Sequence, residues 1–63
     1  AQGVPAEFDR AQALVMSSGR TSPSFVQRTL GIGYNRALAH IERMQAEGLV
    51  SAPDLVGRRA LLR

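Results

Sequence analysis

Arginine supplies most of the chemically active groups in this sequence. The chain has 63 residues, with eight lysine or arginine residues against five acidic ones and a formal net charge of +3. All eight are arginines, at Arg10, Arg20, Arg28, Arg36, Arg43, Arg58, Arg59 and Arg63. A guanidinium group presents a planar fork of donors that fits phosphate oxygens and the edge of guanine. A general bias toward arginine would give the same number of arginines, with side chains that only solvate the surface. The positions of the arginines therefore have to decide between nucleic-acid contacts and ordinary surface charges.

Asn35, Arg36 and Arg43 are the best candidates for contacts with nucleic acid. Together with Ala39 they fall on one side of a helix that we predict from about Tyr34 to Glu47. The opposite side carries the apolar residues Tyr34, Ala37, Leu38, Ile41 and Met44. Asparagine can pair bidentately with adenine and arginine with guanine, so Asn35 and Arg36 could read bases while Arg43 contacts a phosphate. Asparagine near a helix start can equally be a cap, and arginines are mostly exposed in any protein.

Further basic residues lie outside this helix. Arg58 and Arg59 follow a turn in the C-terminal segment, where a loop can run along the DNA backbone or place arginine in the minor groove. The same pair could simply keep a small domain soluble. Arg28 lies on the preceding helix, and it could contact the phosphate backbone or pair with an acidic neighbour.

No group of residues in the sequence suits catalysis or metal binding. Cysteine is absent, which excludes thiolate metal ligands and a cysteine nucleophile. His40 is the lone histidine, the five carboxylates are scattered, and the serines stand near turns and caps. No apolar run approaches the ~18 residues that span a bilayer, and no signal-peptide pattern is present. We therefore expect no enzyme activity, no metal and no cofactor in this chain, and the lack of cysteine fits a cytoplasmic setting.

A first helix is predicted to begin with Pro5, which suits a first helical turn, and to continue to about Met16. Residues 17–20 then stop it. We expect Ala1–Val4 to be a leader, the end of a linker, so that the domain spans residues 5–63. The apolar residues at helical spacing are Phe8, Ala11, Leu14 and Val15.

A second, two-turn helix follows. Its cap is either Ser22, with Pro23 in the first helical position, or Ser24 after a short extended stretch, and the sequence leaves both open. Its apolar side consists of Phe25, Val26 and Leu30. The sequence Gly-Ile-Gly at residues 31–33 breaks this helix, and Ile32 between the two glycines can enter the core.

The predicted fold class is α+β, mainly α: a winged helix-turn-helix. Gly48 suits the end of the third helix because it can take a left-handed backbone. Residues 49–51 and 59–62 are predicted as two short strands, joined by a loop with a Pro-containing turn at residues 52–54. Three helices followed by such a β-hairpin make a winged helix, whose third helix would enter the major groove.

Residues 26–37, VQRTLGIGYNRA, resemble the γ domain of the FtsK/SpoIIIE DNA translocases. That family carries a run reading V-Q-R-x-L-x-I-G-Y-N-R-A at the junction of its second and third helices. The similarity covers nearly the whole chain and continues at Phe8-Asp9, Ile41-Glu42, Met44, Glu47-Gly48 and Val50-Ser51. The run I-G-Y-N-R-A is more specific than anything that winged helices share in general.

The resemblance implies a domain at the C-terminal end of a hexameric, ATP-driven motor that is anchored in the inner membrane at the septum, with this domain on the cytoplasmic side. In that family the γ domain recognises short, polarised, G-rich sites in double-stranded DNA, which orient translocation during chromosome segregation and cell division. In FtsK it also contacts the tyrosine recombinase XerD. By position, Asn35, Arg36 and Glu42 match the family's recognition helix, and Arg59 matches an arginine of its second wing strand. We expect the isolated domain to be monomeric.

Three positions depart from the family pattern. Many members carry arginine where this chain has Ala39, an apolar residue at His40, and glutamate at Ala60. Loss of a groove-facing arginine could remove a guanine contact worth about 1–3 kcal/mol of discrimination. The recognised sequence then differs, or Arg43 and Arg58 compensate.

Two functions of different classes follow from the sequence. The first is sequence-specific binding of double-stranded DNA without catalysis. The alternative is a winged helix for protein–protein interaction, whose exposed helix contacts a partner protein. Binding through phosphates weakens steeply as salt rises, whereas an apolar protein interface does not, so salt dependence separates the two.

Overall fold

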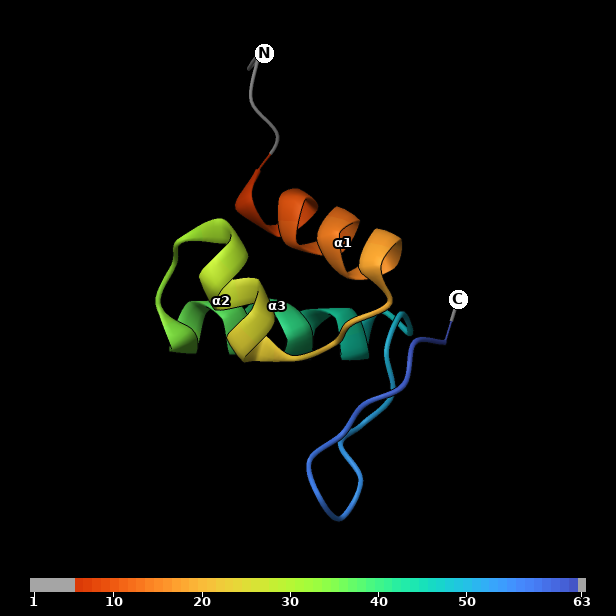
Figure 1. The fold of residues 1–63 in the computed structure, drawn as a ribbon. Coiled ribbons are helices and arrows are strands. Elements are labelled where there is room, and N and C mark those ends of the chain that lie inside the picture. The colour runs from red at the N-terminus through yellow and green to blue at the C-terminus, as the bar shows by residue number, and fades with distance from the viewer. Residues whose placement is uncertain (1–5, 63) are drawn as a thin grey trace.

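The computed structural model describes residues 6–62, which form three helices and a C-terminal arm (Figure 1). The helices are α1 (Glu7–Ser18), α2 (Pro23–Leu30) and α3 (Tyr34–Ala46), in the three places where the sequence predicts a helix. The leader at Ala1–Val4 and Pro5 itself lie outside the described residues. The first helix begins at Glu7, after a non-helical Ala6, and so two residues later than predicted. None of the helices described is long and apolar enough to cross a membrane.

The ends of α1 follow from its terminal residues. Ala6 provides no side-chain cap, but the carboxylates of Glu7 and Asp9 stand in the first turn, where negative charge stabilises the helix dipole. The helix continues to Ser18, two residues beyond the predicted end at Met16. Gly19 stops it with a left-handed backbone (φ 75°), and its N–H donates to the carbonyl of Val15 at 2.9 Å.

Of the two possible caps for α2, the structure has Ser22. Its hydroxyl accepts a hydrogen bond from the N–H of Phe25 at 3.4 Å, and Pro23 occupies the first helical position. Gly31 ends the helix with φ 68°, and the N–H groups of Gly31 and Ile32 both donate to the carbonyl of Gln27. Ile32 is half-buried and packs against the core, so the predicted apolar contact inside the turn is confirmed.

A single core joins the three helices and the start of the C-terminal arm. Each helix contributes at least one buried side chain, and the chain after α3 adds two more. The buried residues are Phe8, Ala11 and Val15 from α1, Val26 from α2, Ala37, Ile41 and Met44 from α3, and Leu49 and Val50 beyond it. Two residues of the predicted apolar side of α3 are less buried than expected: Leu38 is half-buried, and Tyr34, at the very start of the helix, is 47% exposed.

The C-terminal arm, residues 49–62, turns back on itself without forming regular strands. One antiparallel bridge pairs Val50 with Leu61, and the two flanking backbone hydrogen bonds are Ser51 N–H to Ala60 O (2.8 Å) and Leu62 N–H to Leu49 O (2.9 Å). The predicted strands at residues 49–51 and 59–62 are therefore reduced to this bridge within the part of the chain that the structure describes.

Side chains explain why the ladder stops there. The N–H of Ala60 donates to the hydroxyl of Ser51 at 2.8 Å and so does not complete the backbone pair. The next pair in this register would need an N–H from Pro53, which has none. Instead the N–H of Asp54 bonds to the carbonyl of Arg58 at 2.8 Å, which shifts the register by one residue at the tip.

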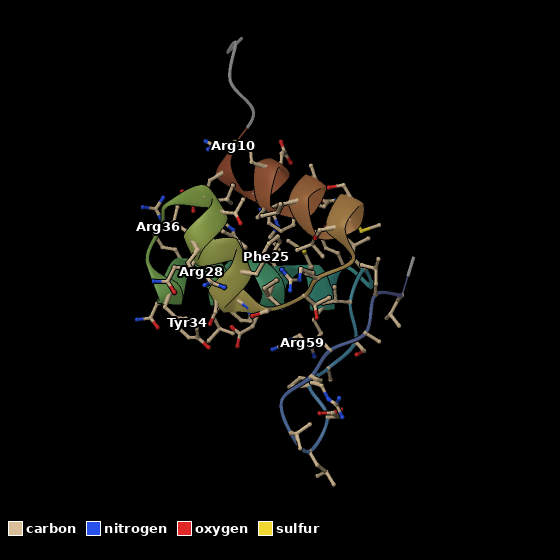
Figure 2. All side chains as sticks on the ribbon, in the orientation of Figure 1. Arg10, Phe25, Arg28, Tyr34, Arg36 and Arg59 are labelled. Atoms are coloured by element: carbon tan, nitrogen blue, oxygen red, sulfur yellow. The ribbon has the colours of Figure 1, made fainter. Side chains whose placement is uncertain are left out.

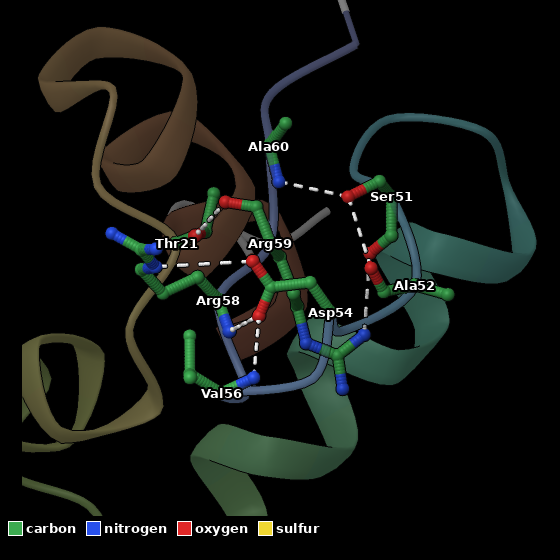
Figure 3. A network of polar contacts seen from close by, with 8 residues as sticks. All are labelled: Thr21, Ser51, Ala52, Asp54, Val56, Arg58, Arg59 and Ala60. Carbon is green, nitrogen blue, oxygen red and sulfur yellow. Dashed lines mark hydrogen bonds and ion pairs between the residues drawn. The ribbon is translucent and has the colours of Figure 1, made fainter.

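Asp54 closes the tip of the arm. Its Oδ1 accepts from the N–H groups of Val56 and Arg58, each at 2.9 Å (Figure 3). Its carbonyl accepts from the N–H of Gly57 at 3.0 Å. Gly57 adopts φ 85°, a left-handed conformation that favours glycine. This compact loop leaves Leu55 and Val56 exposed at its end.

The core predicts a clear difference between two apolar truncations. We expect Ile41→Val, at a fully buried position, to lower the free energy of unfolding by about 0.5–1.5 kcal/mol because it removes a packed methyl group. Leu55→Ala, at the fully exposed tip, should change it by less than about 0.5 kcal/mol. Urea denaturation followed by circular dichroism measures both, and equal losses would contradict this description of the core.

Candidate nucleic-acid interface

The side of α3 that faces solvent carries the predicted contact residues. Asn35, Arg36, Ala39 and Arg43 are all exposed, whereas Ala37, Ile41 and Met44 on the other side of the helix are fully buried. We call the first four residues the recognition side. Glu42, which the resemblance also assigned to the recognition helix, is exposed on α3 as well. The structure thus brings together on one helix surface the residues that the sequence selected.

Asn35 does not cap its helix. The N-cap of α3 is Gly33, without a side-chain capping bond, and Asn35 lies two residues further on with its side chain exposed. The capping interpretation is therefore wrong, because the backbone of the glycine turn already sets the helix start. The amide of Asn35 makes no hydrogen bond within residues 6–62, which leaves its donors and acceptor for a ligand.

Residues in the first turn of α1 contact the basic side chains of α3 that lie next to it. Arg36 Nη2 donates to Glu7 Oε1, and His40 Nε2 lies 2.6 Å from Glu7 Oε2. We call these three residues the Glu7 cluster. One turn further along α3, the guanidinium of Arg43 lies 3.9 Å from the ring centroid of Phe8, and its Nε donates to Glu47 Oε2 at 3.1 Å. Both arginines are therefore oriented by neighbours while their side chains remain 69% and 60% exposed.

Electrostatics in the Glu7 cluster favour the ionised carboxylate. The hydrogen bond with His40 lowers the pKa of Glu7 most, and the nearby charge of Arg36 lowers it further. These effects outweigh partial desolvation, which acts in the opposite direction, so the pKa lies below its ordinary value. Glu7 is accordingly a carboxylate at neutral pH, with both oxygens engaged by α3.

Sequence reasoning did not find the Glu7 cluster. Arg36, His40 and Arg43 follow one another at helical spacing, four and three residues apart, which is a signal for one continuous helix edge. Which residues meet that edge depends on how α1 crosses α3, and no local pattern encodes the crossing. His40 consequently received no role, and Glu7 was one of several scattered acids.

The two arginines of the C-terminal arm differ in environment. Arg58 is exposed, with its Nε 3.8 Å from Asp54 Oδ2. Arg59 is half-buried, and its Nη1 donates to Gln45 Oε1 near the end of α3. Its Nη1 also donates to the carbonyl of Ser51, and its own carbonyl accepts from the hydroxyl of Thr21 at 2.9 Å (Figure 3). Arg59 therefore braces the arm against the helices, and Arg58 is the more accessible charge.

Both arm arginines line an open groove of about 330 Å³ between the arm and the start of α2. Its other lining residues are Thr21, Ser22, Pro23 and Gly57. Arg28 lies at the other end of α2, exposed in the last turn, where its charge suits the helix dipole (Figure 2). Within residues 6–62 Arg28 forms no ion pair, so the predicted pairing with an acidic neighbour is not present there.

The described residues offer nitrogen donors on the surface and no group of metal ligands. No three His, Cys, Asp or Glu side chains come close enough there to hold a metal ion. What the surface offers is a row of amide and guanidinium donors on a rigid helix, flanked by a second basic element. Such an arrangement suits a nucleic acid, whose phosphates are negatively charged and whose base edges present a pattern of hydrogen-bond donors and acceptors.

The geometry defines a class first. A core of three helices, a three-residue turn between α2 and α3 and a polar, basic outer side on α3 are the arrangement of a helix-turn-helix domain. Comparison with known proteins then gives the family: the chain belongs to the FtsK gamma domain family, whose model matches residues 6–63. The resemblance noted from residues 26–37 is thereby confirmed.

Curated relatives agree with this assignment. Over 55 residues, covering 87% of this chain, it is 51% identical to a DNA translocase FtsK of Rhizobium meliloti and 49% identical to one of Agrobacterium fabrum. A DNA translocase FtsK 2 of Neisseria meningitidis is 49% identical over the same length. The matched region is only 5–6% of each of these relatives, so the chain corresponds to one small domain of much longer proteins.

The lowered pKa of Glu7 predicts an acid-sensitive contribution to stability. Because the folded state holds the carboxylate ionised more strongly than the unfolded chain does, this contribution is present above the ordinary glutamate pKa. It is lost as the pH falls below about 4.3 and through the lowered pKa of the folded state. We expect the difference in unfolding free energy between the wild type and Glu7→Gln to shrink over that range. Denaturant titrations at several pH values measure it.

Asp9→Asn is the matched control, because Asp9 lies in the same helical turn but forms no ion pair with a residue in the range 6–62. A pH dependence equal in the two variants would contradict the specific role of the Glu7 cluster.

Proposed function

We propose that this chain is a sequence-specific double-stranded DNA-binding module. It recognises short, polarised, G-rich sites and thereby orients a DNA translocase during chromosome segregation and cell division. The observation that carries the proposal is the recognition side of α3, where Asn35, Arg36 and Arg43 are exposed. The opposite side of the same helix carries the fully buried Ala37, Ile41 and Met44. Membership of the FtsK gamma domain family and relatives named as DNA translocases support it.

In this proposal α3 lies in the major groove with its first turn at the base edges. Asn35 pairs with the N6 and N7 groups of adenine, and Arg36 pairs with O6 and N7 of guanine. Ala39 offers a methyl group that can contact the methyl of thymine. Arg43, held over Phe8 by the contact described above, is placed for a phosphate.

The flanking basic residues bind the sugar–phosphate backbone. Arg28 on α2 and Arg58 on the arm are exposed, and flexible charged side chains suffice for phosphates because these carry no sequence information. We propose that the C-terminal arm acts as the wing, lying along the backbone or at the minor groove. Arg59 takes part by fixing the arm to α3 through Gln45 rather than by offering a free guanidinium.

A second candidate function is protein binding without sequence-specific DNA recognition. The observation in its favour is apolar exposure on the arm, where Leu55, Val56 and Leu62 are exposed by 105%, 70% and 57%. A tyrosine recombinase of the XerD type is the partner that the family resemblance suggests, and we assign no residue to that contact. ATP hydrolysis, the hexamer and the membrane anchor belong, in this proposal, to other parts of a parent translocase.

Selection from a randomised G-rich duplex library, followed by fluorescence anisotropy, tests the main proposal. We expect one G-rich octamer to be enriched, and its affinity to exceed that of a scrambled duplex and to fall steeply between low and moderate salt. A library without enrichment would contradict sequence recognition. Binding of a partner protein that persists at high salt, with no preference among duplexes, would favour the second candidate.

Single substitutions distinguish residues that recognise bases from residues that contact the DNA phosphate backbone. Arg36→Ala should weaken binding to the selected octamer by about 1–3 kcal/mol and change the scrambled duplex much less, since it removes a base contact. Arg58→Ala should weaken both duplexes about equally and lower the salt dependence by roughly one charge. Arg10→Ala, on the exposed side of α1 (Figure 2), is the control for charge loss alone. Equal losses on both duplexes for Arg36→Ala would contradict its reading role.

A further inference from the structure

The carboxylate of Glu7 is fixed from two directions. Its Oε1 accepts from Arg36 Nη2, and its Oε2 lies 2.6 Å from His40 Nε2. His40 is itself half-buried, with its ring centroid 5.8 Å from that of Phe8 in the core. An acceptor held at both oxygens cannot follow a moving arginine, so it restricts the conformations open to the Arg36 side chain.

The same contact leaves most of Arg36 available. The side chain is 69% exposed, and a guanidinium has five N–H donors, of which those on Nη1 and Nε make no hydrogen bond within the described residues. The group is thus oriented without being covered. A restrained arginine loses less conformational freedom on forming a bidentate pair than a free one does.

Glu7 also places a negative charge beside a surface that would meet phosphates. Its side chain is 24% exposed and its lowered pKa keeps it ionised, so it repels any duplex regardless of sequence. Such repulsion acts on correct and incorrect sites alike. Only a site whose bases pair well with Arg36 in its fixed orientation regains the lost binding free energy. An unfavourable element can raise specificity in this way.

We propose that Glu7 is a positioning residue that sets the sequence discrimination of Arg36 at the expense of overall DNA affinity. The inference rests on the proposed function and deepens it, because it adds a residue on α1, outside the helix-turn-helix, to the determinants of specificity. Glu7 acts through Arg36 and not by touching DNA itself.

The test compares Glu7→Ala, Glu7→Gln and Asp9→Ala by anisotropy on the selected octamer duplex and its scrambled counterpart. In Glu7→Ala the scrambled duplex should bind roughly twofold to fivefold more tightly, because a repelling charge is gone. The ratio of the two dissociation constants should fall roughly threefold to tenfold, a part of what one bidentate arginine–guanine pair supplies.

Two variants separate orientation from charge. Glu7→Gln removes the charge but keeps an acceptor oxygen for Arg36, so it should tighten both duplexes while preserving most of the discrimination. Asp9→Ala removes a charge from the same turn of α1, without a contact to Arg36, and should tighten both duplexes equally.

A second measurement needs no DNA: nitrogen NMR relaxation gives the order parameter of the Arg36 Nε–Hε bond. This order parameter should fall in Glu7→Ala and stay near the wild-type value in Asp9→Ala. Unchanged discrimination in Glu7→Ala beside a clear wild-type preference would overturn the inference and leave the proposed function intact. Unchanged Arg36 order would overturn it as well. A wild-type domain without any preference between the duplexes would overturn both proposals.

Discussion

The burial of one side of α3 is the constraint on which the rest of this structure depends. Ala37, Ile41 and Met44 are spaced four and three residues apart and are fully shielded from solvent by α1, α2 and the chain after α3. A domain of this size has little other apolar surface to bury, so rotation of α3 about its axis would remove much of the core. The orientation of the recognition side is therefore fixed by packing and not by the polar residues themselves.

The arginines differ in how firmly neighbouring side chains hold them, and for Arg36, Arg28 and Arg58 this difference matches what the proposed role requires. Arg36 and Arg43 are oriented by Glu7, Phe8 and Glu47, and Arg59 is braced against Gln45. Reading a base edge needs a defined geometry, whereas a phosphate tolerates a mobile charge. Arg28 and Arg58, on the flanks of α3, have the looser environment that backbone contacts permit.

Local signals in the sequence predicted the helices and most of the candidate site. Glycines with left-handed backbones end α1 and α2, apolar spacing identified the buried side of α3, and the exposed positions of Asn35 and Arg36 followed from the same spacing. The choice between Ser22 and Ser24 needed coordinates, because both are good caps and only one meets the N–H of Phe25.

Two features depended on contacts that no local pattern contains. The Glu7 cluster arises where α1 crosses α3, between residues 29 and 33 positions apart. The predicted strands of the arm were reduced to one bridge because Ser51 and Asp54 side chains take the N–H groups of Ala60 and Arg58 that a regular ladder would use. In both cases a polar side chain competes successfully for a partner, and such competition is decided by three-dimensional placement.

The most direct test of this account is an amide NMR titration of the domain with the selected octamer duplex. The account predicts that the largest shifts fall on residues 34–43 of α3, with smaller ones at the tip of the arm and at Arg28, and that the C-terminal half of α1 stays unchanged. Shifts concentrated on the exposed side of α1, with α3 unaffected, would contradict the central claim that the recognition side of α3 meets the DNA.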